Sequence, residues 1–225
     1  MPICLANQNI DSLLYELLLE GDITPSEELI ASLRIYLEEL YSWNQHINLT
    51  GLKTMEEMAI KHIGDTLTLL RVLPEDVHHL LDIGTGPGVP GFILKLFRLD
   101  LEIVLVDAIR KKVSFLNTII AKIGLKGIWA EHCRVIPKDI PRHSPLKGFD
   151  IIVSQAVGPL DELARMARPL MSINGLVIAM KGPKVDEELE KKMGYLQRHG
   201  WKTSIIKTQT PVGSFRRNLV TLRRY

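Results

Sequence analysis

The chain has 225 residues, 46% of them hydrophobic, and a formal net charge of +2. This length suits one well-packed domain with an extension, and the apolar fraction excludes wholesale disorder. No apolar run of the sequence approaches the roughly 18 residues that a membrane-spanning helix needs, and the first twenty residues lack the basic segment and cleavage site of a signal peptide. We therefore expect a cytoplasmic protein that does not enter a membrane.

The small net charge hides an uneven distribution along the chain. Residues 1–82 carry 4 Lys and Arg against 14 Asp and Glu, residues 83–164 carry 11 against 8, and residues 165–225 carry 13 against 4. An excess of cations at one end favours a surface for a polyanion such as nucleic acid. The alternative is a solvated basic face that binds nothing.

The two cysteines, Cys4 and Cys133, form neither a CxxC pair nor a cluster with histidine. Paired or clustered cysteines are the sequence signs of disulfide frameworks and of zinc sites. We therefore expect two free thiols in a reducing compartment and no bound metal.

Residues 1–73 are predicted to form a helical extension. Residues 24–40 begin with Thr24 as helix N-cap, Pro25 at the first helical position and Glu27 three residues after the cap, which is the arrangement of a capping box. A second capping box, Thr54 to Glu57, begins a helix that Pro74 brings to an end.

Residues 74–225 are predicted to form the main domain, in which strands alternate with helices. The expected strands are 78–84, 101–107, 127–132, 148–156 and 175–182, and the expected helices are 91–98, 110–124, 159–171 and 184–200. Nearly continuous apolar strands in this alternation predict an α/β fold with a mostly parallel, doubly wound, Rossmann-like sheet covered by helices on both faces. The tail 203–225 reads as two strands too close together for a crossover helix, so we expect an antiparallel edge.

The segment LDIGTGPGVPG, residues 81–91, follows the first predicted strand, where Rossmann-like sheets bind their ligands. Its glycines let the backbone turn tightly and let a ligand approach closely, although one G-x-G-x-x-G pattern is also compatible with a purely structural turn. Asp107 ends the next predicted strand, nineteen residues after Gly88. A carboxylate there accepts the hydroxyls of a ribose, or it caps the following helix. The two features together favour an adenosine-containing ligand.

Two details favour S-adenosylmethionine (SAM) over a dinucleotide. Pro87 and Pro90 lie inside the loop, and proline lacks the N–H group that such a turn donates to a pyrophosphate. Asp82 stands just before the first glycine, where its charge would repel a diphosphate but suits a cation. SAM has no phosphate and carries a sulfonium and an ammonium group. We therefore predict SAM as the cofactor and reject an NAD-dependent oxidoreductase.

Six blocks of the sequence together resemble one known family. They are WNQHINLTGL (43–52), KHIGDTL (61–67), LDIGTGPGVPG (81–91), VDAIRKKVSFL (106–116), SQA (154–156) and MKG (180–182). In this order they are similar to the bacterial 16S ribosomal RNA guanine-N7 methyltransferases, also called glucose-inhibited division protein B. The resemblance covers about residues 30 to 222, and its first two blocks are more specific than the glycine loop because SAM-dependent enzymes in general lack them.

The resemblance implies a SAM-dependent enzyme that methylates N7 of a guanosine in 16S ribosomal RNA. Its partner would be 16S ribosomal RNA or the small ribosomal subunit, and we expect the protein to be a monomer. Guanine N7 has a free lone pair, so the reaction needs no strong general base and depends on positioning. A carboxylate, Asp65 or Asp82, is expected to steady the charge that moves from the sulfonium to the guanine ring.

The resemblance also implies which residues form the site. The cofactor-binding residues would be Asp82, Gly84, Thr85, Gly86, Gly88, Val89, Asp107, Arg134, Val135, Ile136 and Gln155. The polar residues at the active-site mouth would be Asn48, His62 and Asp65, and Lys181 and Arg217 would lie on the RNA side. The chain departs from the family at two positions: Gln155 replaces an arginine, and Ile136 replaces an acidic residue. These departures bear on the cofactor contacts and on the rate.

The cations nearest the predicted site in sequence are expected to form one basic rim beside the cofactor, namely Arg110, Lys111, Lys112, Lys181, Lys184, Arg216, Arg217, Arg223 and Arg224. Phosphate contacts from such a rim would make RNA binding depend strongly on salt. Two alternatives stay open. One is a SAM- or RNA-binding module that has lost activity with the arginine at position 155. The other is a small-molecule methyltransferase on the same fold, which leaves the basic C-terminal part unexplained.

Overall fold

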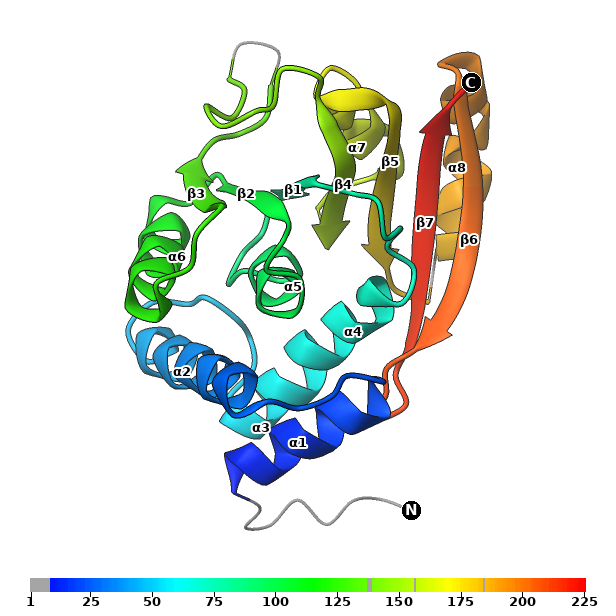
Figure 1. The fold of residues 1–225 in the computed structure, drawn as a ribbon. Coiled ribbons are helices and arrows are strands. Elements are labelled where there is room, and N and C mark those ends of the chain that lie inside the picture. Colours follow the sequence, from blue (N-terminus) through cyan, green and yellow to red (C-terminus); the bar gives the residue numbers. More distant parts are fainter. Residues whose placement is uncertain (1–8, 137–138, 156, 184) are drawn as a thin grey trace.

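The computed structural model describes residues 9–136, 139–155, 157–183 and 185–225 (Figure 1). Its centre is a seven-stranded sheet with the strand order β3-β2-β1-β4-β5-β7-β6. The strands are β1 (His79–Ile83), β2 (Glu102–Asp107), β3 (Ile128–His132), β4 (Phe149–Gln155), β5 (Met171–Lys181), β6 (Trp201–Gln209) and β7 (Arg216–Arg224). Strands β1 to β5 pair in parallel, and β7 lies antiparallel between β5 and β6. The predicted mostly parallel sheet with an antiparallel edge is therefore confirmed.

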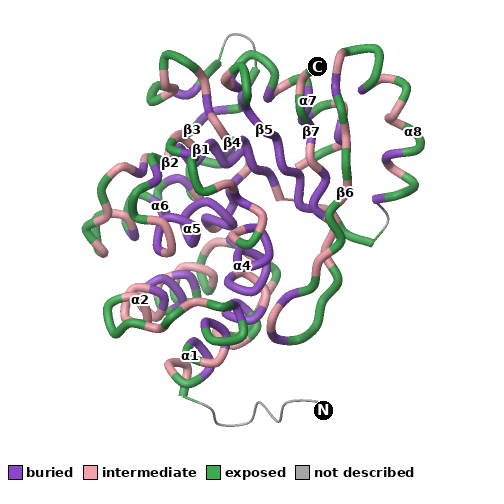
Figure 2. The backbone as a smooth tube through the Cα atoms, turned by 45° about the vertical axis from the view of Figure 1, so that its right-hand side comes forward, coloured by how far each residue is buried: buried purple, intermediate pink, exposed green. Residues whose placement is uncertain are grey.

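Helices cover both faces of the sheet. One face packs against α5 (Gly91–Phe97) and α6 (Arg110–Ile123), and the other packs against α7 (Leu160–Ala167) and α8 (Val185–Arg198). Successive side chains of a strand point to opposite faces, so Leu80 of β1 joins the first core and Leu81 the second. Figure 2 shows that buried residues follow the strands, while exposed residues gather in the peripheral loops. This double burial explains why the strands read as continuous apolar runs.

The helical segment before β1 packs against the α5 and α6 side. It contains α1 (Ile10–Glu20), α2 (Glu27–Asn44), α3 (Met55–Met58), the π-helix η1 (Ala59–Ile63) and α4 (Gly64–Leu70). Its buried leucines belong to the same hydrophobic cluster as α5 and α6. In Figure 1, α2 lies outside α5 and α6, whereas α4 lies beside α5 toward β7. The segment therefore does not bury a core of its own.

Three predicted helix boundaries can be compared with the structure. Helix α2 begins after Ser26, whose hydroxyl accepts a hydrogen bond of 3.2 Å from the Leu29 amide, so the predicted cap at Thr24 is wrong by two residues. The predicted cap at Thr54 is confirmed, because its hydroxyl accepts the Glu57 amide at 3.1 Å. Helix α7 ends at Ala167, earlier than predicted, because Met171 already pairs with Phe149 as the first residue of β5.

Candidate functional site

A cavity of about 480 Å³ lies where β1, β2 and β4 end. In an open, mostly parallel sheet this edge is the ligand-binding position. Helices η1 and α4 and the loop after α2 complete its walls. The lining residues are Thr50, Gly51, Leu52, Lys61, His62, Asp65, Gly84, Thr85, Gly86, Pro87, Val89, Asp107, Lys112, Gln155 and Val157. The structure thus brings together several of the predicted site residues, includes Lys112 of the predicted basic rim, and adds Lys61, which was not predicted.

The glycine loop is tied to β2 and leaves its backbone open toward the cavity. The Gly84 and Thr85 amides both donate to the Val106 carbonyl, at 2.8 and 3.0 Å. A Cβ at Gly84, where φ is +70°, would lie 2.1 Å from a methyl group of Val157, so glycine is required there. At Gly86 the nearest atoms to such a Cβ are 3.9 and 4.0 Å away. Any side chain at Gly86 would therefore occupy space that a ligand can fill.

Asp82 lies beneath this loop and is completely buried. Its Oδ2 accepts hydrogen bonds from the Thr85 hydroxyl at 2.7 Å and from the Gly91 amide at 2.9 Å. Burial raises the pKa of Asp82 to about 7, although both hydrogen bonds oppose this shift. Asp82 does not line the cavity, in contrast to the expectation that its charge would face a cation. The structure instead makes it the residue that fixes the shape of the glycine loop.

Asp107 binds two backbone segments beside the cavity but does not cap α6, whose N-cap residue is Ile109. Its Oδ1 accepts the Ile109 amide at 2.8 Å, which holds the turn before α6. Its Oδ2 accepts the Gly86 amide at 3.0 Å and lies 3.9 Å from the Lys112 ammonium. The carboxylate lines the cavity at the end of β2. It is therefore placed where a ribose could meet it.

Asp65 joins α4 to two strands of the sheet. Arg217 of β7 donates from Nε to Oδ1 of Asp65 at 2.6 Å, and Gln155 of β4 donates from Nε2 to Oδ2 at 2.8 Å. Burial raises the pKa of Asp65, while the hydrogen bond and the charge of Arg217 oppose this effect. Gln155 thus binds this carboxylate without adding a charge, and the guanidinium paired with Asp65 comes from β7.

His62 lies on the π-helix η1 and lines the same cavity. Within the described part of the chain, its Nε2 is buried and has no hydrogen-bond partner. Burial lowers the pKa of His62 to about 4, and the neighbouring Lys61 acts in the same direction. The imidazole is therefore neutral at neutral pH. Single π-helical turns occur frequently at functional sites, so this polar atom is a candidate for binding a ligand.

Asn44, which was not predicted as a site residue, holds the loop that contains the predicted residue Asn48. The Asn44 Oδ1 accepts the amides of Leu49 and Thr50 at 2.9 Å, and its Nδ2 donates to the Leu52 carbonyl at 3.1 Å. Asn48 is exposed and does not line the cavity. The signal for Asn44 was its place in the specific block WNQHINLTGL. An asparagine at the end of a helix is well suited to hold the following turn.

Lys181 is held away from the cavity. Its ammonium donates to the Gly158 carbonyl at 2.7 Å and to Glu188 Oε1 at 3.0 Å, and only 12% of its side chain is exposed. Glu188 also accepts the Leu160 amide at 2.8 Å. Lys181 therefore fixes the start of α7 to α8, and the structure shows no free ammonium there for an RNA phosphate.

The residues predicted to surround the adenine lie in the loop after β3 and do not line the cavity. Arg134 and Ile136 are exposed, and Val135 is buried with φ of +50°. The Arg134 amide donates to Asp139 Oδ2 at 3.0 Å. Because β3 pairs in parallel with β2, this loop starts at the same edge of the sheet as Asp107.

The predicted single basic rim is wrong. Arg216 and Arg217 begin β7, whereas Arg223 and Arg224 end it. Seven residues of a strand extend about 23 Å, so the two pairs lie at opposite ends of β7. The sequence shows how many charges the tail carries, but it does not show at which end of a strand each charged residue lies. Lys184 lies outside the described residues.

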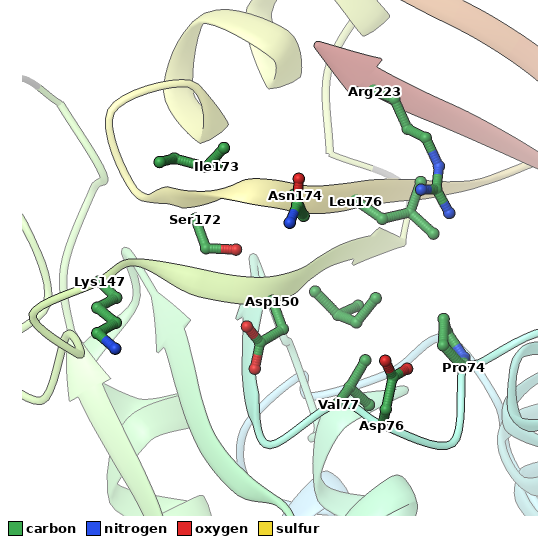
Figure 3. Close-up of a pocket in the computed structure, with 11 residues that line it drawn as sticks. Pro74, Asp76, Val77, Lys147, Asp150, Ser172, Ile173, Asn174, Leu176 and Arg223 are labelled. Carbon is green, nitrogen blue, oxygen red and sulfur yellow. The ribbon is translucent and has the colours of Figure 1, made fainter.

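A larger hollow of about 740 Å³ lies at the opposite edge of the sheet (Figure 3). Lys147, Asp150, Ser172, Asn174 and Arg223 are among the residues that line it. The Asp150 carboxylate already binds the backbone there, because its Oδ2 accepts hydrogen bonds from the amides of His78 and His79 at 3.1 and 3.0 Å. This hollow contains none of the predicted site residues, so size alone does not identify the functional site.

Three further observations concern metal ions, membranes and thiols. In the described ranges, no group of three or more His, Cys, Asp and Glu side chains could hold a metal ion. None of the helices that the structure describes is both long and apolar enough to cross a bilayer. Cys133 is a buried free thiol, and Cys4 lies outside the described residues.

Comparison with known proteins gives consistent matches. The model of the family described as rRNA small subunit methyltransferase G matches residues 29–220. The Ribosomal RNA small subunit methyltransferase G of Desulforamulus reducens is 35% identical over 208 residues, which cover 92% of this chain and 85% of the relative. The protein of the same name from Syntrophotalea carbinolica is 32% identical over 212 residues, covering 94% and 96%.

Solved structures of methyltransferases share the fold. A putative S-adenosyl-L-methionine-dependent methyltransferase of Methanococcus maripaludis matches with a TM-score of 0.56 and 16% identity, covering 76% of this chain and 90% of that one. The ribosomal protein L11 methylase of Lactobacillus delbrueckii matches with a TM-score of 0.53 and 16% identity, covering 72% and 78%. At these identities the likeness concerns the fold alone.

Proposed function

Because the chain belongs to the rRNA small subunit methyltransferase G family, we propose that it transfers a methyl group from SAM to N7 of a guanosine in 16S ribosomal RNA. The observation that carries this proposal is the cavity at the carboxyl edge of the sheet, where the glycine loop, Asp107 and Asp65 meet. Its substrate places the protein in the cytoplasm. We propose that it acts as a monomer.

The residues of the cavity fit SAM. Its volume of about 480 Å³ is within the usual range for small-molecule sites, and the backbone at Gly86 is open toward it. The Asp107 carboxylate is placed to accept ribose hydroxyls, and the Asp65 carboxylate lines the same cavity but is already paired with Arg217. When bound, SAM supplies an electrophilic methyl group on a positively charged sulfur.

The remaining cofactor assignments follow from position. Thr85, Gly86 and Val89 line the cavity beside Gly84, and we assign them to the methionine part of SAM. Gly88 turns the loop at φ of +96°, and Asp82 fixes it from below. We assign the loop of residues 134–136 to the adenine, because it follows β3 next to Asp107.

The protein's residues accelerate the reaction by positioning the guanine and excluding water. N7 attacks with its own lone pair, so no residue has to remove a proton from it. Asp65 stays near the reacting centre because Arg217 and Gln155 fix both of its oxygens. The neutral imidazole of His62 can donate from one nitrogen and accept at the other. We therefore assign His62 to hold the guanine edge and Asp65 to stabilise the charge that moves onto the ring.

The RNA backbone would lie along the start of β7. A hollow of about 610 Å³ there is lined by Lys207, Arg216, Arg217 and Asn218, among others. Arg217 also pairs with Asp65 of the cofactor cavity, so the two hollows meet at this residue. Cations beside the cavity suit phosphates on either side of the target guanosine. Lys181 would support this region through Gly158 rather than by touching RNA.

Mass spectrometry of 16S ribosomal RNA from cells with and without the gene tests the proposal. We expect one N7-methylguanosine to disappear when the gene is removed and to return when it is restored. An unchanged set of modified nucleosides would reject the proposed activity. A protein that binds SAM and ribosomal RNA but leaves the RNA unmodified would instead be the inactive binding module.

A further inference from the structure

Phe215 is a large apolar side chain that is left 38% exposed beside the site. It lies in the turn between β6 and β7, just before Arg216. Its amide donates to the hydroxyl of Thr210 at 2.9 Å, and its carbonyl accepts the Thr210 amide at 3.0 Å. Thr210 itself is buried. The turn is therefore held by hydrogen bonds at its base, which fixes where the ring emerges.

The same turn packs against the helix that carries the polar cavity residues. A Cβ built at Gly64 would lie 3.5 Å from the Thr210 Cβ, and one built at Gly213 would lie 3.3 Å from a methyl group of Ile60. Ile60 and Gly64 flank Lys61 and His62 in sequence. In Figure 1 the loop that joins β6 to β7 lies beside α4. The turn that carries Phe215 is thus packed against the helical segment that contains Lys61 and His62.

Two cations surround the ring. The Lys61 ammonium is 5.8 Å and the Arg217 guanidinium carbon is 5.6 Å from its centroid. Lys61 lines the cofactor cavity, and Arg217 binds Asp65, which also lines it. Phe215 does not line the cavity itself. The ring therefore lies outside the cofactor cavity and next in sequence to Arg216 and Arg217, which line the basic hollow.

We propose that Phe215 stacks against the nucleobase next to the target guanosine. Single-stranded RNA is held by aromatic rings on which bases stack, together with cations that bind its phosphates. Phe215, Arg216 and Lys207 combine these two elements at one end of the hairpin. The ring's place outside the cavity assigns it a flanking base rather than the guanine that receives the methyl group. The inference rests on the proposed function, because it takes ribosomal RNA as the ligand.

Four variants of the full chain test this stacking: Phe215→Ala, Phe215→Leu, Phe215→Trp and, as an exposed aromatic that lines neither hollow, Tyr15→Ala, whose side chain is 50% exposed on α1. The measurements are KM for undermethylated small ribosomal subunits, kcat, the Kd of SAM and the Kd of 16S ribosomal RNA. Loss of one stacked base is expected to weaken RNA binding roughly ten-fold. We expect this loss in the alanine and leucine variants, near-normal RNA binding in the tryptophan variant, and an unchanged Kd of SAM in all four.

Leucine separates stacking from packing because it keeps an apolar side chain and removes the aromatic face. Normal RNA binding by Phe215→Leu would overturn the inference, as would a loss of kcat alone, which would mean that the ring only orients Arg217. The RNA-binding measurement does not depend on methyl transfer. If the wild-type protein binds the RNA but does not methylate it, the proposed function fails. The RNA affinities of the Phe215 variants then still test whether the ring stacks on a base.

Discussion

The hydroxyl of Tyr36 on α2 donates a hydrogen bond of 3.1 Å to the carbonyl oxygen of Pro87 in the glycine loop. Tyr36 is completely buried, and its ring stacks on Phe92 of α5 with a centroid distance of 5.2 Å. Pro87 is part of the cavity wall. The helical segment before the sheet is therefore a structural part of the cofactor site, because it holds the loop from outside.

Tyr36→Phe removes this hydrogen bond and keeps the ring. Loss of one buried hydrogen bond should lower the free energy of unfolding by about 1 kcal/mol, and the freed loop should bind SAM several-fold more weakly. Isothermal titration calorimetry and urea unfolding measure the two effects, with Tyr41→Phe on the same helix as the control, since Tyr41 is 39% exposed. A loss of stability with unchanged SAM affinity would show that Tyr36 does not position the loop.

Asp65→Asn keeps the shape of the side chain and removes its charge. We expect kcat to fall ten-fold or more, because the carboxylate no longer stabilises the charge on the guanine, while the Kd of SAM stays within about two-fold. The variant should also be less stable by about 3 kcal/mol, since Arg217 loses its buried partner. Single-turnover kinetics and calorimetry check both expectations. An equal loss of turnover and SAM affinity would mean that Asp65 only supports the pocket.

The pH dependence of stability should reveal His62. Burial lowers its pKa from 6.5 to about 4, so between these values the unfolded chain binds a proton that the folded chain does not. The stability from neutral His62 is therefore fully present above pH 6.5 and is lost as the pH falls toward 4. His62→Gln lacks this titration, so the wild-type protein should lose about 3 kcal/mol more than the variant over this range.

Asp82 acts in the opposite direction over an overlapping range of pH. Its pKa rises from 3.8 to about 7 on burial, so its contribution to stability is lost as the pH rises from 4 to 7. The wild-type and His62→Gln proteins both contain Asp82. The difference between their free energies of urea unfolding at each pH therefore reports the titration of His62 alone. Parallel curves for the wild-type and His62→Gln proteins would show that the imidazole is charged in the folded state.

Reversing one charge at the hairpin should reduce the salt dependence of RNA binding. Lys207 and Lys202 both lie on β6. Lys207 lines the basic hollow at the start of β7, whereas Lys202 lies at the other end of β6, so Lys202→Glu is the control for Lys207→Glu. Each phosphate contact with a single strand contributes a slope of about −0.7 in log K against log salt. We expect Lys207→Glu to lose at least one such contact and Lys202→Glu to behave like the wild-type protein. Equal slopes for both variants would mean that RNA does not follow this surface.

The order and type of most elements could be predicted because continuous apolar strands alternate with amphipathic helices. The position of the cofactor loop followed from the same pattern, since the loop after the first strand of such a sheet has a fixed place. The Asp65–Arg217 pair could not be predicted by spacing, because 152 residues separate the two. It exists because β7 inserts beside β5 with Arg217 at the cavity edge.

Other features depend on local geometry that the sequence pattern does not contain. Asp82 and Asp107 both end apolar strands, yet one turns under the loop and the other turns into the cavity. Asn44 and Asn48 stand in one motif, and only the three hydrogen bonds of Asn44 distinguish them. The sequence shows how many basic residues the tail contains. It does not show that β7 places Arg216 and Arg217 at one end of the strand and Arg223 and Arg224 at the other.

The most direct test of the central claim is methyl transfer by the purified protein. Small ribosomal subunits from cells lacking the gene would be incubated with the protein and SAM carrying a labelled methyl group, and the nucleosides of the 16S ribosomal RNA would be separated by mass spectrometry. We predict that the label appears as N7-methylguanosine at one position and is strongly reduced with Asp65→Asn. Label on another nucleoside, or no label on RNA that the protein binds together with SAM, would contradict it.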